Sequence, residues 1–334
     1  MNVAIIGCGL IGRKRASALD PDDRLAACCD TDGRIAAALG RERNCPSYTD
    51  YRDLLSETEC EAVIVAVVNK FMKDIVVDAL DSGRHVLAEK PLGRNAVEAE
   101  QMLRRVQAAS QDFQVLKTGF NHRFHPAVWK AKRICNTGKI GEVLTIRARY
   151  GHGGRPGMEK EWRSSKDLCG GGELLDQGVH VIDLVRWFGG DIVEAFGKVE
   201  TRFWNIEVED NAFAVLKTDR NVTASFHVSW TNWRNIFSFE VFGTDGYVKI
   251  EGLGGSYGPE TLEHGIRKKE GGRPDVETFA FPPEDVSWKE EWQEFKAAVR
   301  ENREPVGSGL DGLRANEVVE ALYRSSEKRS VVVL

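Results

Sequence analysis

The sequence contains no uninterrupted apolar stretch of the roughly 20 residues that a membrane-spanning helix requires. It also contains no low-complexity tract. Its first residues, MNVAIIGCGLIG, show neither the basic segment nor the small-residue cleavage site of a secretory leader. These absences argue against a membrane protein and against export, and they predict a cytoplasmic protein.

Cysteine is present but lacks the pattern of a disulfide or metal framework. Seven cysteines are an odd number, and no two of them form a CxxC pair. His122 and His125 form an HxxH, but no third ligand cluster accompanies them, so we expect no metal site. Scattered thiols of this kind are typical of a reducing compartment.

Charge of one sign is not in large excess either. The formal net charge is −5, the pI is about 5.9, and the basic cluster GRKR at 12–15 is short. Nucleic-acid-binding proteins usually carry a basic face, so we expect no nucleic-acid partner. The chain does have 334 residues, of which 42% are hydrophobic, and this is enough to build two ordinary domains.

Up to about residue 120, short and nearly continuous apolar runs alternate with helical patterns. Such runs form parallel strands when helices cover both faces of the sheet. We therefore predict an α/β fold whose first domain, residues 1–122, is a doubly wound Rossmann domain. Its expected strands are 3–7, 25–30, 62–68, 85–90 and 113–120.

Beyond this point the apolar residues recur with a two-residue period, which is typical of an antiparallel sheet with one buried face. A helix is predicted at 173–190, and two more at 287–300 and 311–328. We predict an α+β domain over residues 123–308, followed by a C-terminal helix and tail, 309–334, that packs back on the first domain. The expected strands are 143–150, 211–218, 222–230, 237–243 and 246–252.

The segment GCGLIG has the GxGxxG pattern of a dinucleotide-binding turn, directly after a predicted strand and before a helix. Gly7 would allow the tight turn, Gly9 would let backbone N–H groups approach a pyrophosphate, and Gly12 would permit close packing of helix on strand. The next apolar run ends at Asp30, where a carboxylate can bond the adenosine ribose and repel a 2′-phosphate. We therefore predict NAD. NADP is less favoured, although the cations at 13–15 could reach a phosphate, and the alternative is a glycine-rich turn without a ligand.

The segment AEKP places Glu89, Lys90 and Pro91 at the carboxyl end of a predicted parallel strand. Ligands of Rossmann sheets bind at that edge, so Lys90 would point into the crevice where a nicotinamide ring lies. Pro91 ends the strand there, because it has no N–H to donate. The alternative is a lysine that is merely solvated at a strand end.

The predicted helix at 173–190 has two unlike faces. At 100 degrees per residue, one narrow stripe is formed by Asp176, His180, Asp183 and Trp187. A carboxylate and an imidazole at positions i and i+4 can meet, and an imidazole titrates near neutrality, as a general base requires. The alternative is an ordinary solvated face.

These motifs together resemble those of the glucose-fructose oxidoreductase and inositol dehydrogenase family, often written Gfo/Idh/MocA. The resemblance covers essentially the whole chain and rests on GCGLIG, AEKPLGRN, GFNHRFHP and GGGELLDQGVHVIDLVRWF. It implies an N-terminal Rossmann domain, a C-terminal domain with a large open, mainly antiparallel sheet that often mediates oligomerisation, and NAD(P)-linked chemistry on sugars, nucleotide sugars or cyclitols.

The resemblance also implies roles for individual residues. The catalytic trio would be Lys90, Asp176 and His180, and Asn121 and Arg123 would flank the substrate crevice. The residues expected to contact the cofactor are Gly7, Gly9, Leu10, Ile11, Gly12, Asp30, Glu89, Lys90 and Pro91. A homo-oligomer, dimer or tetramer, is expected through the C-terminal sheet.

Members encoded with surface-polysaccharide genes look most similar, through YGHGGRPG and the segment 160–180. That similarity favours a nucleotide-linked sugar as substrate, with Arg155, Trp162, Arg163 and Asp176 on the substrate side. The alternative is that these charges only keep a loop in water. Two other functions stay open, an NAD-retaining glycoside hydrolase of the same family and a dinucleotide-binding regulator without activity.

Overall fold

The computed structural model describes residues 1–108 and 113–334, and their contacts divide the chain into two compact units. The Rossmann unit comprises residues 1–120, 167–170 and 288–314. The sheet unit comprises residues 121–166, 171–287 and 315–334.

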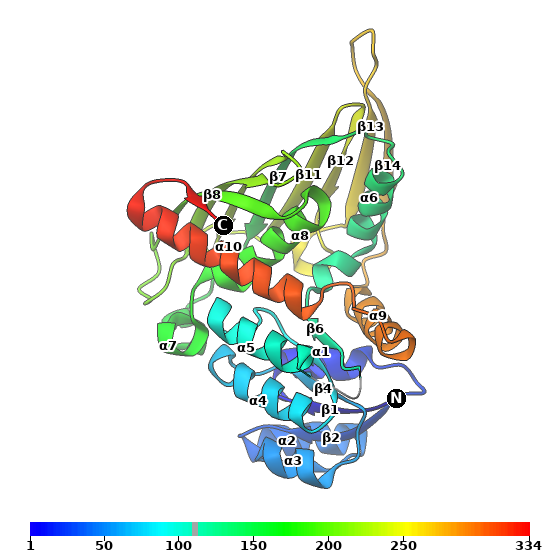
Figure 1. Ribbon diagram of the computed structural model, residues 1–334, viewed down its shortest axis with the longest axis vertical. Helices are drawn as coiled ribbons and strands as arrows, with labels where there is room; N and C mark the ends of the chain where they lie inside the picture. Colours follow the sequence, from blue (N-terminus) through cyan, green and yellow to red (C-terminus); the bar gives the residue numbers. More distant parts are fainter. Residues whose placement is uncertain (109–112) are drawn as a thin grey trace. The chain divides into compact units, whose positions relative to one another are not determined.

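The Rossmann unit contains a six-stranded, fully parallel sheet with the strand order β3-β2-β1-β4-β5-β6 (Figure 1). The five predicted strands are all present, and one short strand, β3, was not predicted because two residues carry no periodicity. The strands are β1 Asn2–Ile6, β2 Arg24–Cys29, β3 Ser47–Tyr48, β4 Ala62–Val65, β5 His85–Ala88 and β6 Leu116–Thr118.

Helices join these strands, as the near-continuous apolar strand sequences require. They are α1 Leu10–Ala18, α2 Gly33–Arg43, α3 Tyr51–Glu57, α4 Asn69–Asp81, α5 Ala96–Gln107, the short α7 Lys166–Cys169, whose first residue groups with the sheet unit, and α9 Ser287–Glu301. The sheet has a buried cluster on each face, which is the arrangement of a doubly wound fold.

The helix α9 follows the whole second domain in sequence but belongs by its contacts to the Rossmann unit from Trp288 onward. Its apolar residues Trp292 and Phe295 are fully buried in one cluster with Val3 and Ile5 of β1. The sequence boundaries at 122 and 308 therefore differ from the contact division, because an amphipathic pattern does not say which sheet it will cover.

The sheet unit contains nine strands in the order β14-β13-β12-β11-β7-β10-β9-β8-β15. All neighbours are antiparallel except β7 and β10, so the predicted mainly antiparallel sheet is confirmed. The strands are β7 Val143–Gly151, β8 Ile192–Glu200, β9 Asn211–Thr218, β10 Thr223–Ser229, β11 Ile236–Gly243, β12 Gly246–Glu251, β13 Thr261–Ile266, β14 Asp275–Ala280 and β15 Val332–Val333.

Helices lie against one face of this sheet, and Figure 1 shows α6, α8 and α10 on the same side. They are α6 Pro126–Asn136, the π-helical turn η4 Leu174–Gly178, α8 Val179–Gly189 and α10 Gly309–Lys328. Four short 3-10 turns are also present, η1 Asn121–Phe124, η2 Met158–Lys160, η3 Trp162–Ser164 and η5 Gly255–Tyr257. The unit boundary falls within α10, so residues 315–334, expected against the first domain, group with the sheet unit.

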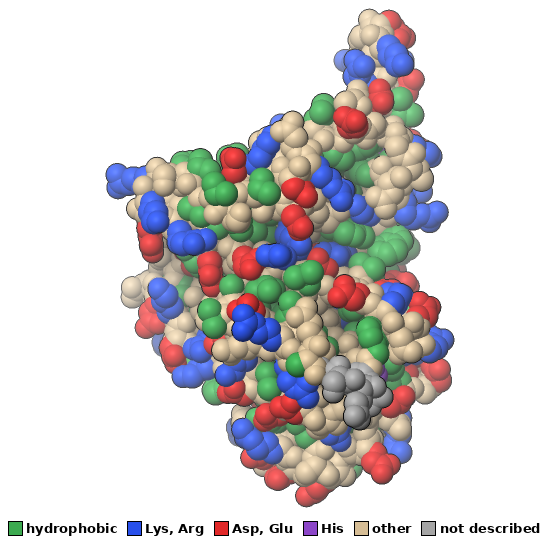
Figure 2. Space-filling model, viewed as in Figure 1, with side chains coloured by type: hydrophobic (Ala, Val, Ile, Leu, Met, Phe, Trp, Pro, Cys, Tyr) green, Lys and Arg blue, Asp and Glu red, His purple; other side chains and the backbone are tan. Residues whose placement is uncertain are grey.

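The other face of the sheet is open. Along β9, Ala214 and Leu216 are buried under the helices, whereas Phe213 and Val215 are exposed on the opposite face. Phe196 of β8 is exposed on that face too, beside a shallow depression of about 560 Å³. The hairpin of β13 and β14 projects beyond the sheet, and Figure 2 shows charged side chains of both signs at its tip.

Among the described residues, no helix combines the length and the apolar character needed to cross a membrane.

Candidate active site

The glycine turn between β1 and α1 has the geometry that a dinucleotide requires. Gly7 has φ of +96°, and a Cβ added there would lie 2.1 Å from the carbonyl oxygen of Ala66. A Cβ on Gly12 would lie 1.8 Å from the carbonyl oxygen of Gly7, so helix and strand pack directly. At Gly9 a Cβ would meet nothing within 4 Å, which leaves the N-terminus of α1 open to an approaching phosphate.

Asp30, at the end of β2, is tied to this turn. Its carboxylate accepts the backbone N–H of Cys8 at 2.9 Å and that of Asp32 at 3.0 Å. The carboxylate is thereby held beside the glycine turn, where ribose hydroxyls can donate to it. Next to Gly9, Leu10 is largely exposed and Ile11 is half-buried, and their contact with a cofactor stays a prediction.

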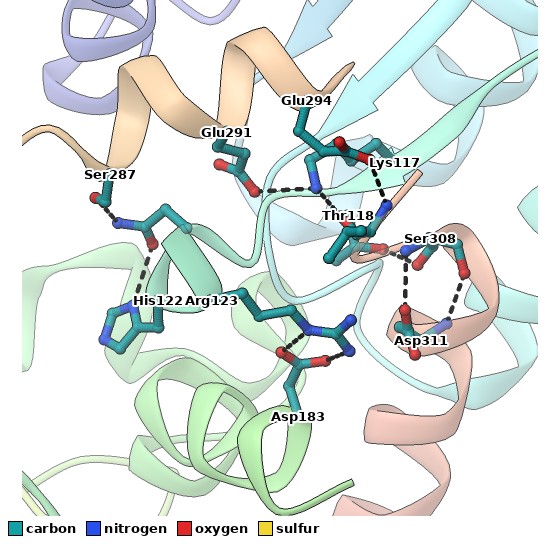
Figure 3. A network of polar contacts seen from close by, with 12 residues as sticks. Lys117, Thr118, His122, Arg123, Asp183, Ser287, Glu291, Glu294, Ser308 and Asp311 are labelled. Carbon is teal, nitrogen blue, oxygen red and sulfur yellow. Dashed lines mark hydrogen bonds and ion pairs between the residues drawn. The ribbon is translucent and has the colours of Figure 1, made fainter. Parts of the chain in front are cut away.

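The segment after β5 is anchored by a buried ion network. Glu89 accepts Arg15 Nε at 2.6 Å, and Arg15 also donates to Glu291 of α9 at 2.6 Å. Burial would lower the pKa of Arg15, but the two carboxylates outweigh it and raise that pKa, so the guanidinium stays charged. Lys117, which Figure 3 shows with Glu291, belongs to the same network. Glu89 thus fixes the chain on which the half-buried Lys90 and the buried Pro91 follow.

The predicted helix at 173–190 is present, but its first turn differs from the expected geometry. Leu174–Gly178 forms a π-helical turn, and the regular α8 begins at Val179. π-Helical turns are wider than α-helical ones and occur frequently at functional sites. The turn contains Asp176, whereas His180 lies in the first turn of α8.

The polar stripe of this helix is largely buried, so the alternative of an ordinary solvated face is wrong. His180 is 4% exposed and Asp183 is fully buried, while Asp176 is half-buried. Buried polar side chains require partners, and each such group has a structural or a chemical role.

The partner of Asp183 is Arg123, a residue predicted to flank the substrate. Arg123 donates from Nε to Asp183 Oδ2 at 2.8 Å and from its Nη2 to Oδ1 at 2.5 Å, and Figure 3 shows the two groups facing each other. Both side chains are almost completely buried. The pair therefore joins η1 to α8, and a contact between Arg123 and a substrate stays a prediction.

We expect Arg123→Met to lower the free energy of unfolding by about 3–5 kcal/mol, because it leaves the Asp183 carboxylate buried without its counter-charge. The double variant Arg123→Met, Asp183→Leu should recover much of that loss, since it removes both charges. Urea denaturation of the single and double variants measures the difference. An equally unstable double variant would show that the pair is not what stabilises this junction.

The surroundings of His180 include residues that the sequence did not single out for catalysis. The His122 ring stacks on the His180 ring, with the ring centroids 3.7 Å apart and the planes at 19°. The ring centroid of Tyr150, on β7, lies 5.1 Å from that of His122. His122 Nδ1 donates to Asn121 Oδ1 at 3.1 Å, and the Asn121 amide donates to Ser287 at 2.9 Å (Figure 3). The predicted substrate residue Asn121 therefore holds the ring that stacks on His180.

Tyr150 is the sheet's contribution to this cluster. Its burial raises the pKa of its phenol well above the usual value, and the nearby Tyr257 and Glu173 raise it further. Tyr150 therefore keeps its proton and can donate a hydrogen bond. The one sequence signal for Tyr150 is the two-residue period of β7, which places its side chain on the covered face of the sheet.

Arg155 and Arg163, the two arginines predicted on the substrate side, have different partners in the structure. Arg163 Nε lies 3.5 Å from Asp176 Oδ2, and its guanidinium lies over the Trp162 ring at 4.4 Å. Arg155 is exposed and pairs with Glu161 at 2.7 Å. Asp176, Arg163 and Trp162 are thus brought together, whereas Arg155 is held by its own loop.

Comparisons with known proteins agree with this structure. Residues 1–117 match the family described as "Oxidoreductase family, NAD-binding Rossmann fold", and residues 128–249 match the "GFO/IDH/MocA C-terminal domain". Together the two matches cover more than half of the chain. The chain belongs to the Gfo/Idh/MocA oxidoreductase family, and the expectation of an NAD-binding Rossmann domain is confirmed.

Curated relatives include two named dehydrogenases. The chain is 29% identical to inositol 2-dehydrogenase 2 of Saccharopolyspora erythraea over 336 aligned positions, covering 97% of this chain and 93% of the relative. It is 25% identical to levoglucosan dehydrogenase of Pseudarthrobacter phenanthrenivorans, covering 74% and 73% of the two chains.

Solved structures share the fold over the full length. Levoglucosan dehydrogenase in complex with NADH and levoglucosan matches with a TM-score of 0.91 at 23% identity, covering 100% of this chain and 99% of that chain. The WlbA dehydrogenase from Bordetella pertussis, in complex with NADH and UDP-GlcNAcA, matches with a TM-score of 0.83 at 20% identity, covering 100% and 98%.

Proposed function

We propose that this protein is an NAD-dependent dehydrogenase that oxidises a secondary hydroxyl of a sugar or cyclitol, with a nucleotide-linked sugar favoured. The observation that carries the proposal is the burial of His180, four residues after the half-buried Asp176, in a chain of an oxidoreductase family. An imidazole that is buried against the rings of His122 and Tyr150 suits proton transfer better than it suits an apolar core.

In the proposed mechanism His180 takes the proton of the hydroxyl, and Asp176 orients the imidazole or binds a neighbouring hydroxyl. Lys90 holds the hydroxyl oxygen as an ammonium and offsets the negative charge that develops on it. The nicotinamide supplies the acceptor for the hydride from the same carbon. The alternative is that Lys90 takes the proton, and the pH profile of a His180→Gln variant distinguishes the two roles.

The nucleotide-linked substrate is supported by cations near Asp176. Arg163 is half-buried beside it, and Arg155 lies on the same loop and can exchange Glu161 for a phosphate. The chain as a whole carries a net negative charge, yet these two arginines lie on one loop. Two cations on a loop that contacts Asp176 favour a substrate with a negative charge.

The open face of the sheet supports the proposal of a homo-oligomer. Phe196, Phe213 and Val215 are exposed there in adjacent strands, and a monomer rarely leaves such a patch uncovered.

One experiment tests the function directly. The purified protein is analysed for copurified dinucleotide and then incubated with NAD and a panel of nucleotide sugars, sugar phosphates and inositols, with absorbance followed at the reduced nicotinamide band. Oxidation of one class supports the proposal. Release of an aryl group from an aryl glycoside, without a net absorbance change of the cofactor, would indicate the glycoside hydrolase instead, and dinucleotide binding without any turnover would indicate the regulator.

Cofactor choice gives a separate prediction. We expect Asp30→Ala to weaken NADH binding by about tenfold to a hundredfold, since charge-assisted hydrogen bonds to the ribose are lost. The preference for NADH over NADPH should also fall, because the negative charge no longer opposes a 2′-phosphate. Fluorescence titration with both dinucleotides measures this.

Asp32→Ala is the matched control for NADH affinity. Asp32 lies two residues further on and caps α2 by accepting the N–H of Arg34 at 2.9 Å. Its loss should lower stability by about 1 kcal/mol and leave NADH affinity nearly unchanged. Equal affinity losses in the two variants would contradict a specific role for Asp30.

A further inference from the structure

Three loops of the sheet unit are joined to one another beside the imidazole helix. They are residues 152–166, 201–210 and 230–235. The N–H of Asn232 donates to the carbonyl of His152 at 3.2 Å, and the N–H of Glu207 donates to the carbonyl of Ser164 at 3.2 Å. The three loops therefore form one surface.

This surface is attached to the start of the candidate catalytic helix. Glu209 receives the N–H of Glu173 on its carbonyl at 3.0 Å and the N–H of Leu174 on its carboxylate at 3.1 Å. From the neighbouring loop, Arg163 lies 3.5 Å from Asp176. The loop 152–166 therefore joins this surface to Asp176, the residue that we propose meets the sugar.

Two large aromatic rings of these loops are exposed to solvent. Phe203 is 61% exposed and Trp233 is 62% exposed, and their ring centroids are 4.7 Å apart with the planes at 80°. The Trp204 ring packs edge-on against Phe203, with centroids 5.2 Å apart. Trp204 is itself fixed, because its ring contacts Gly154, where an added Cβ would come within 2.5 Å, and its Nε1 donates to the carbonyl of Trp230 at 3.0 Å. The Phe203–Trp233 pair is therefore an exposed aromatic surface whose neighbour Trp204 is fixed in place.

The backbone holds both rings in the exposed position. Trp233 has φ of 55°, in the left-handed region that bulky residues rarely adopt. The Asp210 carboxylate accepts the backbone N–H groups of Arg202, Phe203 and Trp204 at 2.7, 2.8 and 2.9 Å. Burial alone would raise the pKa of Asp210, but the hydrogen bonds from the Asn211 side chain and from these three N–H groups lower that pKa, so the carboxylate stays charged.

We propose that the Phe203–Trp233 pair is a subsite that stacks a second ring of the substrate, attached to the sugar that is oxidised. The enzyme would then act on a sugar carrying another ring in preference to a free monosaccharide. This inference rests on the proposed function.

The chemistry of the subsite suits a ring with an apolar face. Aromatic side chains stack on nucleobases, and a pyranose presents C–H groups in the same way, so a nucleoside base and a glycosidically linked sugar are both candidates. The cations Arg155 and Arg163 lie on one of the three loops, where the diphosphate of a nucleotide sugar would need them.

The test uses the full-length protein with Phe203→Ser, Trp233→Asn and both changes together. Asparagine tolerates a positive φ, so Trp233→Asn removes the ring without adding backbone strain. For the sugar that is oxidised in the panel, kcat/KM is measured for the free sugar, its phenyl glycoside, a disaccharide containing it and its UDP derivative. We expect the double variant to lose about tenfold to a hundredfold on the ring-bearing forms and less than about twofold on the free sugar.

The three ring-bearing forms distinguish the sources. A selective loss on the UDP derivative identifies a base, and a selective loss on the disaccharide and phenyl glycoside identifies a second sugar. Phe213→Ser is the matched control, since Phe213 is also a phenylalanine with about half of its surface exposed (51%), on the open face of the sheet. It should leave the ratio between ring-bearing and free sugar unchanged, whatever it does to assembly.

Two results would overturn the subsite. One is an equal loss on free and ring-bearing sugars. The other is a change in assembly mass by light scattering in the double variant, which would make the pair a subunit contact.

If no sugar is oxidised, the proposed function fails, and calorimetry with UDP, dTDP and phenyl β-glucoside still tests the pair. Binding to wild type that the double variant weakens supports the subsite, and binding that is absent or unchanged refutes it.

Discussion

Replacing Lys90 by methionine should reduce turnover by about three orders of magnitude while leaving NADH affinity within about twofold of wild type. Methionine keeps the length and apolar character of the stem but removes the ammonium, which we propose holds the reacting oxygen. Removing one preorganised donor typically costs a factor of 10²–10³, and a charged donor binds a developing negative charge more strongly than a neutral one does. The measurement is kcat on the sugar found in the panel, beside a fluorescence titration with NADH.

Lys73→Met is the matched control. Lys73 lies on α4 of the same unit and pairs with Asp74 at 2.7 Å, so its loss should change neither turnover nor NADH affinity appreciably. Wild-type turnover in Lys90→Met would refute the assignment of Lys90. A parallel loss of NADH affinity would show instead that Lys90 serves the cofactor.

Replacing His180 by glutamine should reduce kcat by about 10²–10⁴-fold, the usual contribution of a positioned general base. Glutamine retains a polar side chain of similar reach but cannot take a proton at neutral pH. If His180 is the base, the wild-type rate should fall as the pH is lowered and the imidazole is protonated, and the variant should lack this acid limb. A pH profile of kcat for both proteins measures it.

His264→Gln controls for the disturbance of a buried imidazole. His264 lies on β13, in the same unit as His180, and both side chains are 4% exposed. Its replacement should lower stability without changing the pH profile of kcat. An acid limb that persists in His180→Gln would assign the titrating base to another group, of which Lys90 is the first to examine.

The Rossmann unit was predictable from sequence because its signals are local. A parallel strand covered on both faces needs a continuous apolar run, and a glycine turn needs glycine at the positions where a Cβ would strike the backbone. Gly7 and Gly12 show this directly, since a Cβ on either would lie about 2 Å from a carbonyl oxygen. The candidate residues Asp30, Lys90 and His180 were found in the same way, from their positions relative to predicted strands and helices.

The predictions that missed concern pairing over long sequence separations. The stripe on the helix at 173–190 has the same pattern whether it faces water or the interior, and only its burial beside Arg123 and His122 excludes a solvated face. Strands β13 and β14 were not predicted for a local reason. The buried positions of β13 include His264 and Gly265, and β14 is almost wholly exposed, so neither strand shows an alternation of apolar and polar residues. The attachment of α9 to the Rossmann unit depends on the shape of a surface nearly 300 residues earlier in the chain.

The sequence by itself determined the element types, the glycine turn and the identity of the chemical groups, because each of these depends on residues within one turn or one strand. The tertiary structure alone decided which polar groups are buried, which rings stack on His180 and where Phe203 and Trp233 are exposed. The physical reason is that burial and pairing are properties of two surfaces brought together, and a linear pattern describes only one of them.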